Sequence, residues 1–287
     1  ALKSVTQKGD KVMIQPPVYG PFHWLNTRGD RTLVTNPLKL VDGMYRMDME
    51  AFRRDVKGCK VFILCNPHNP GGVVWTEEEL KEVAEICYEE GVLVFSDEIH
   101  ADLTLPPHKH RPFAMVSEKA RMNSVTFMSP SKAFNMPGLT ASHALIFNPK
   151  LRRKFHTYLE SSELDLGHVF AFLAVEAAYS HGTEWLDQCL AYIQGNIDYV
   201  DEFTKQHTPK IKVIRPQASF LVWLDCREMG LAQDALNDFF VDKAHLALNN
   251  GVAFGEEGEG FMRLNVASPR SVLEKAMKQL ADAYAAL

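Results

Sequence analysis

The chain has 287 residues, of which 46% are hydrophobic and 23% are charged, so it is long enough for one large domain or two smaller ones. A net charge of −5 without an evident basic face argues against nucleic acid and anionic membranes as partners. The longest apolar runs are far too short to span a bilayer.

Strand and helix patterns alternate through the first half of the chain. Residues 1–9 read as the last turns of a helix closed by Gly9. An amphipathic helix is expected over 76–91, with Thr76 as its N-cap and Glu79 completing a capping box. Apolar runs predict buried strands, in chain order, at 11–15, 60–65, 92–95, 124–128 and 143–147. This alternation predicts an α/β fold with a mostly parallel sheet covered by helices.

The pattern changes after residue 150. Residues 151–206 are expected to be largely helical, with an interruption near residue 180. Beyond them the chain predicts two strands within 210–225, a helix over 232–244, a strand over 261–267 and a last helix over 271–286. These elements predict a second, smaller α+β unit. We place the boundary near residue 189, which gives a large domain over 1–188 and a small domain over 189–287.

The cysteines and histidines favour neither a disulfide framework nor a metal site. The five cysteines are odd in number and form no CxxC pair, which predicts reduced, partly buried thiols in a cytoplasmic protein. The sequence HKH at 108–110 offers two histidines, but no cysteine or acidic cluster accompanies them as further ligands. We therefore expect no metal.

Three of the expected strands run into polar, chemically capable residues. Residues 66–72 (NPHNPGG), 96–100 (SDEIH) and 129–132 (SPSK) follow the strands that end near 65, 95 and 128. Each polar residue has a purely structural reading, such as a turn cap for Asn69 or a solvated head group for Lys132. Ligands of open α/β sheets bind at the carboxyl ends of strands, so the convergence of three such ends favours a functional site.

These residue types suit pyridoxal phosphate (PLP). A lysine that forms a Schiff base must be partly desolvated, which fits Lys132 at the mouth of a buried strand. A pyridine cofactor that withdraws electrons needs a carboxylate at its ring nitrogen, which Asp97 offers. The ring oxygen needs a donor such as Asn69, and the phosphate needs hydroxyls or backbone amides.

The motifs NPHNPGG, SDEIH and SPSKAFNMPGL, in this order, resemble those of fold-type I PLP enzymes, which are aspartate-aminotransferase-like. In detail, SDEIHADL, HKHRPF and SPSKAFNMPGL are similar to the cystathionine β-lyase or C–S β-lyase group. The resemblance extends from QPPVYGPF to the C-terminus. It implies a PLP cofactor, a small amino-acid substrate, α,β-elimination of a thiol, and a homodimer with its sites at the subunit interface.

The resemblance also implies a role for individual residues. Lys132 matches the lysine that forms the Schiff base with the cofactor and moves the Cα proton, and Arg263 matches the arginine that binds the substrate α-carboxylate. The matched cofactor contacts are Tyr19, stacked on the ring; Asn69 and His100, near the ring oxygen; Asp97, at the ring nitrogen; and Ser129 and Ser131, at the phosphate.

Two departures from the family pattern bear on these roles. Thr140 stands eight residues after Lys132, where aminotransferases commonly carry a phosphate-binding arginine, and this favours elimination. The family has further sequence before residue 1, which supplies a backbone cradle for the phosphate, so we expect this chain to lack an N-terminal segment. An aminotransferase, and a non-catalytic regulatory or binding protein on the same scaffold, are the alternatives.

Overall fold

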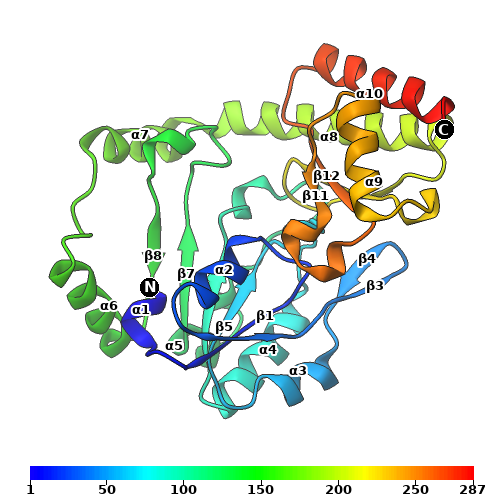
Figure 1. Cartoon of the computed structure of the whole chain (residues 1–287). Coiled ribbons are helices and arrows are strands. Elements are labelled where there is room, and N and C mark those ends of the chain that lie inside the picture. The colour runs from blue at the N-terminus through cyan, green and yellow to red at the C-terminus, as the bar shows by residue number, and fades with distance from the viewer.

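The computed structural model describes all 287 residues, and its main feature is a six-stranded sheet (Figure 1). The strands lie in the order β2-β1-β5-β6-β7-β8, and every neighbouring pair is parallel except β7 and β8. Their bounds are β1 (Lys11–Ile14), β2 (Thr32–Thr35), β5 (Cys59–Cys65), β6 (Leu93–Asp97), β7 (Ser124–Met128) and β8 (His143–Leu145). The expected mostly parallel sheet is therefore confirmed.

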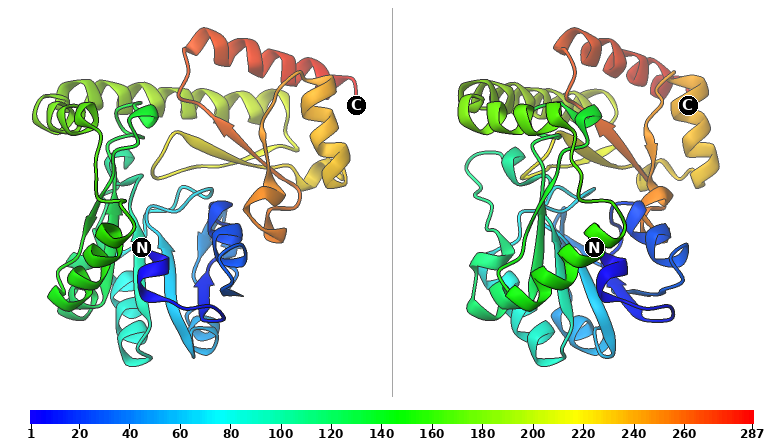
Figure 2. Two further views of the ribbon diagram at one scale, coloured as in Figure 1. Left: turned by 60° about the vertical axis from the view of Figure 1, so that its left-hand side comes forward. Right: turned by 90° about the vertical axis from the view of Figure 1, so that its left-hand side faces the viewer.

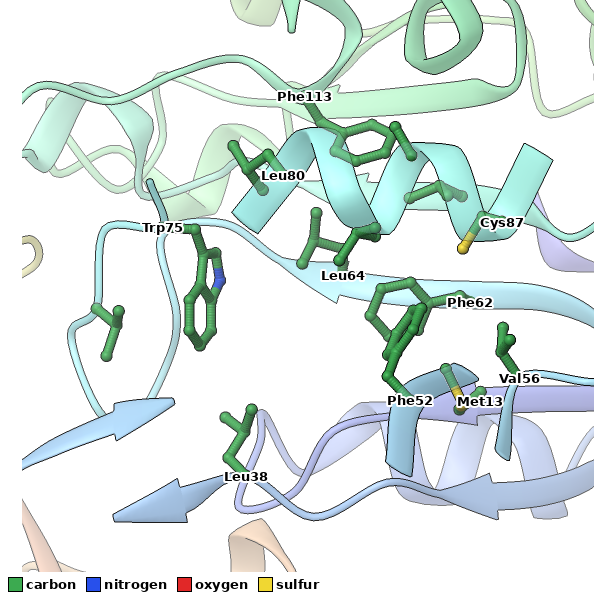
Figure 3. Close-up of a cluster of buried hydrophobic side chains, with 14 of the residues drawn as sticks. Met13, Leu38, Phe52, Val56, Phe62, Leu64, Trp75, Leu80, Cys87 and Phe113 are labelled. Carbon is green, nitrogen blue, oxygen red and sulfur yellow. The ribbon is translucent and has the colours of Figure 1, made fainter. Parts of the chain in front are cut away.

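Helices cover both faces of this sheet, which explains why its central strands are apolar throughout. In β5, Phe62 and Leu64 point into a cluster of 24 buried residues, whereas Val61 and Ile63 point into another of 10. The larger cluster, part of which is drawn in Figure 3, packs against α3 (Met49–Asp55), α4 (Glu77–Glu89) and α5 (Glu118–Met122). The smaller one packs against α1 (Leu2–Val5), α2 (Pro21–Thr27) and α6 (Pro149–Ser161).

The helix expected over 76–91 forms as α4 for the reasons that its sequence indicates. Thr76 accepts from the backbone of Glu79, and the Glu79 side chain accepts from the backbone of Thr76, so the capping box is complete. The buried residues Leu80, Val83 and Cys87 lie on one stripe of the helix. Gly91 follows the helix with φ +66°, a left-handed conformation that glycine adopts without strain.

A second sheet of four antiparallel strands forms the smaller unit, in the order β11-β12-β10-β9. Its strands are β9 (Lys212–Ile214), β10 (Leu221–Asp225), β11 (Asn249–Asn250) and β12 (Phe261–Asn265). Three helices share a 20-residue buried cluster with this sheet: α8 (Thr183–His207), α9 (Gln233–Asp238) and α10 (Arg270–Ala285). Figure 2 shows the C-terminus in this unit and the N-terminus beside α6. Residue 189 lies inside α8, so the division at that position stays a prediction.

The sequence patterns did not predict three of the short strands. Besides β2, the chain forms a hairpin from β3 (Lys39–Val41) and β4 (Met44–Arg46). This hairpin touches the smaller unit, because the Trp223 indole donates to the Tyr45 hydroxyl over 3.1 Å in a buried setting. α7 (Val169–His181) joins α8 at Gly182, which confirms the interruption near residue 180. None of the helices combines the length and apolar character that a membrane span requires.

Candidate active site

The polar residues predicted at three strand ends do meet at one edge of the large sheet. β5, β6 and β7 are parallel neighbours, and Asp97 pairs in register with Cys65 on one side and Phe127 on the other. The smaller unit closes this edge and leaves a cavity of about 200 Å³. Its lining comprises Tyr19, Cys65, Asn69, Asp97, Ile99, His100, Lys132, Phe220, Leu221, Arg263 and Asn265.

Lys132 reaches this cavity from a tight turn that follows β7. Backbone bonds from Phe134 to Pro130 (2.9 Å) and from Met136 to Ser131 (3.0 Å) close the turn. The side chain is half-buried, and it lines both this cavity and a neighbouring one of about 430 Å³. Lys132 therefore lines the site and is half-buried, as the sequence predicted.

Asp97 is the last residue of β6, and its carboxylate is the acidic group of the cavity lining. One of its oxygens accepts from the backbone of Ile99 over 3.2 Å. Burial raises the pKa of this carboxyl to about 6, and the negative charge of Glu98 acts in the same direction. A cationic partner in the cavity would restore the charged form, because opposite charges lower the pKa of an acid.

Asn69 and Arg263 come together although 194 positions separate them in the chain. The Arg263 guanidinium donates through Nη1 to Asn69 Oδ1 over 2.9 Å. This bond fixes the orientation of the amide, since only its oxygen can accept, and leaves the Asn69 Nδ2 group free to donate. A cofactor ring oxygen in the cavity would be a suitable acceptor for it.

Arg263 is placed by the alternation of side chains along β12. Phe261 faces the core of the large unit and Met262 faces that of the small unit, so Arg263 points back toward the large unit. Its Nη2 donates to Asn249 over 2.8 Å, and its guanidinium carbon lies 4.6 Å from the ring centroid of Phe254. Burial lowers its pKa to about 10, so the group remains a cation at neutral pH.

The rings of His100 and Tyr19 also line the cavity. His100 is buried, its Nδ1 has no hydrogen-bond partner, and burial lowers its pKa to about 3, so its imidazole is neutral. Tyr19 is 39% exposed and packs edge-on against Phe22, with centroids 5.6 Å apart. It lines the cavity, where its ring could stack on a flat ligand.

The two serines lie outside the small cavity. Ser129 lines an adjoining, largely apolar cavity of about 550 Å³, which shares Asp97 and Ile99 with it, and Ser131 lines the 430 Å³ cavity. Their hydroxyl oxygens are 2.7 Å apart, and the Ser129 hydroxyl also donates to the carbonyl of Ala141. A phosphate beside them would have to replace these mutual bonds.

The lining fits the ring of PLP. An unpartnered buried nitrogen on His100, a free amide NH₂ on Asn69 and a buried carboxylate on Asp97 are the groups that such a ring would satisfy. Sequence reasoning missed Asn249, Phe220 and Asn265. Of these, only Asn265 could have been found, because it follows Arg263 by two residues and so shares its face of β12.

Comparisons with known proteins place this fold in one class. A family model described as aminotransferase class I and II matches residues 1–280. Cystathionine β-lyase PatB of Bacillus subtilis (strain 168) is 41% identical over 98% of this chain and 73% of its own length. Protein MalY of Escherichia coli (strain K12) is 34% identical over 100% of this chain and 73% of its own.

A solved structure agrees with these relatives. Cystalysin from Treponema denticola, which contains a pyridoxal 5′-phosphate cofactor, superposes with a TM-score of 0.95 at 32% identity, over 99% of this chain and 73% of its own. The architecture is therefore that of a fold-type I, PLP-dependent enzyme. The chain belongs to the aminotransferase class I and II family.

Proposed function

We propose that the chain catalyses PLP-dependent α,β-elimination on cystathionine or related cysteine S-conjugates, giving a thiol, pyruvate and ammonia. The observation that carries this proposal is the placement of Lys132, Asp97 and Arg263 around one cavity. The relatives named above support the carbon–sulfur lyase reaction over the other reactions of the family.

Arg263 and Lys132 act on the substrate itself. Arg263 binds the α-carboxylate through the donors that Asn69 and Asn249 leave free, among them Nε, which has no partner. Lys132 removes the Cα proton as a neutral amine. The Cβ–S bond then breaks, the sulfur keeps the bonding electrons, and the proton on Lys132 can be passed to the leaving thiolate. The remaining fragment hydrolyses to pyruvate and ammonia.

The other residues hold the cofactor. When bound, PLP supplies an electron sink for the pair that remains on Cα. Asp97 would hold the proton at the ring nitrogen, Asn69 and His100 would face the ring oxygen, and Tyr19 would stack on the ring. Ser129 and Ser131 would bind the phosphate. Lys132 would also form the covalent link to the cofactor.

An aminotransferase is the second candidate, because the same three residues serve both reactions. An aspartate aminotransferase of Geobacillus stearothermophilus is 28% identical over 95% of this chain. The absence of an arginine at position 140 favours elimination: Thr140 is exposed there, with φ +48°. Formation of glutamate from 2-oxoglutarate without pyruvate would identify an aminotransferase. A chain that binds PLP and forms neither product would be a binding or regulatory protein.

Two further parts of the proposal concern assembly and location. We propose a homodimer, supported by α7, whose exposed side chains include Phe170, Phe172 and Leu173 at 58–64% exposure. Light scattering that gives the mass of one chain would contradict it.

A cytoplasmic location is supported by five free cysteines, four of them buried.

The deciding experiment is reduction with borohydride after incubation with PLP, followed by peptide mass mapping. We expect one pyridoxyl adduct, on Lys132, and pyruvate release from cystathionine well above the rate with free PLP. Lys150→Ala, at an exposed lysine in α6, should leave the adduct intact, whereas Lys132→Ala should abolish it. Adducts scattered over surface lysines, or none, would contradict the proposed site.

A further inference from the structure

A buried carboxylate lies directly behind the site, on the residue after Asp97. Glu98 is 1% exposed and lines none of the cavities around Lys132. Its Oε1 accepts from the Ser96 hydroxyl and from the backbone of Phe113, each over 2.8 Å. Its Oε2 accepts from His110 Nε2 over 2.7 Å. Both carboxylate oxygens are thus fully engaged, as a buried charge requires.

The segment that holds Glu98 also holds the neighbouring turn of the site. Asn66 begins the turn that carries Asn69, and its Nδ2 donates to the carbonyl of Arg111 over 3.1 Å. Residues 110–113 therefore bind the turn after β5 through Asn66 and the turn after β6 through Glu98. Asn69 reaches the cavity from the first of these turns, and Asp97, the last residue of β6, reaches it from the start of the second. We call residues 110–113 the bridging segment.

His110 is the one residue of the bridging segment whose side chain forms a hydrogen bond with Glu98. Its side chain is 10% exposed, and its Nδ1 has no partner, so Nε2 carries the proton that Glu98 accepts. The only other hydrogen bond from this segment to Glu98 comes from the backbone amide of Phe113, which a change of the His110 side chain leaves in place. Loss of the imidazole would leave one oxygen of a buried carboxylate without a donor.

We propose that His110 and Glu98 are positioning residues, which hold the end of β6 so that the Asp97 carboxylate faces the ring nitrogen of the cofactor. The inference rests on the proposed function, because it assigns Asp97 its partner. Neither residue touches the cavity, so both act only through the backbone and charge next to Asp97. The Glu98 charge also acts on Asp97, because it raises the pKa of that carboxyl in addition to the larger effect of burial.

The first test compares His110→Ala with His110→Gln. The alanine variant removes the donor, and we expect PLP affinity to fall about tenfold or more, the loss typical of a buried charged group left unpaired. We expect kcat for pyruvate release to fall similarly while KM for cystathionine changes about twofold at most, because Arg263 is unaffected. The glutamine variant places an amide NH₂ near the Nε2 position and should restore both quantities to within about threefold.

A matched control separates positioning from general stability. Val83→Ala truncates a fully buried side chain in α4 and should lower the unfolding midpoint without changing PLP affinity. In the cofactor-free protein, amide exchange at Ile99, which donates to Asp97, should rise in His110→Ala and not in Val83→Ala. This readout does not depend on the loaded enzyme, so its failure is distinct from failure of the proposed function.

A second variant keeps the inference testable if His110→Ala does not fold. Glu98→Gln can still accept from Ser96 and Phe113, and its amide can donate to His110 after a tautomer change, so only the charge is lost. We expect near-normal PLP affinity but a lower pH midpoint of the absorption change of bound cofactor, because a nearby negative charge no longer favours the protonated form. An unchanged midpoint, or unchanged Ile99 exchange in His110→Ala, would overturn the proposal.

Discussion

The buried carboxylate of Asp97 lowers the stability of the cofactor-free protein, although the proposed function requires it. Its carboxyl lies at the end of an apolar strand, and burial raises its pKa to about 6. Well below the unfolded pKa of 3.8 the group is protonated in both the folded and the unfolded chain, so it does not affect stability there. As the pH rises to about 6 the unfolded chain releases this proton first, so the folded state loses stability, and the loss persists at higher pH.

Asp97→Asn should therefore stabilise the cofactor-free protein at neutral pH while it damages catalysis. At pH 7 we expect a gain of about 1–3 kcal/mol in the free energy of unfolding. The gain should disappear at pH 3.5. Urea unfolding at the two pH values measures it, and a gain that is larger at pH 3.5 would contradict the assignment. Pyruvate release should fall about 10²-fold or more, as expected when a stabilising charge is removed from an active site.

Arg263 tests whether the geometry of the cation matters as well as its charge. Arg263→Lys keeps the charge but cannot bond Asn69, Asn249 and a substrate carboxylate together, because an ammonium lacks the planar fork. We expect kcat/KM for cystathionine to fall about 10- to 100-fold, mainly through KM. Arg215→Lys, at an exposed position, is the control and should stay close to the parent enzyme. A purely kcat effect would argue against carboxylate binding.

At the scale of single elements, local patterns identified the long, strongly patterned segments. The α4 sequence carries its cap, its apolar stripe and its stop glycine within 16 residues, so nothing distant is needed to place it. β2 and the β3–β4 hairpin carry no such pattern. Each has three or four residues, few of them buried, and each depends on a neighbouring strand for its hydrogen bonds.

Thr76→Ala measures the contribution of the α4 cap. Removal of the hydroxyl leaves the Glu79 amide without its acceptor, and we expect a loss of about 1 kcal/mol in the free energy of unfolding. Thr157→Ala, an exposed position inside α6, should change stability by no more than about 0.5 kcal/mol. Urea titration of both variants makes the comparison. Equal effects would mean that the cap does not stabilise α4.

At the scale of the whole molecule, the site exists because the smaller unit closes against the strand ends. Gly72 lies at this contact: its carbonyl accepts from the backbones of Gln217 and Ala218 over 2.8 and 3.1 Å. Its φ is +68°, and a Cβ built on it would lie 2.4 Å from the Pro216 side chain. The two units therefore approach one another as closely as a glycine allows.

Gly72→Ala should disrupt this contact. Strain from the positive φ and the collision with Pro216 together predict a loss of about 2–4 kcal/mol in the free energy of unfolding. PLP affinity should fall too, because Arg263 and Asn69 come from opposite sides of the contact. Gly138→Ala has no atom within 4 Å of the added Cβ and serves as the control. A variant as stable as this control would contradict the close approach.

The sequence by itself determined the parallel sheet, the α4 helix and the residues that end β5, β6 and β7, because these depend on periodicity, caps and neighbouring positions. It also placed Lys132, Asn69 and Asp97 at one edge, since parallel neighbouring strands end together. Only the tertiary structure decided that Arg263 donates to Asn69 across 194 positions, that His110 donates to Glu98, and that Ser129 lines an adjoining cavity. These contacts join segments far apart in the chain, and they depend on how the two units pack, which no local pattern encodes.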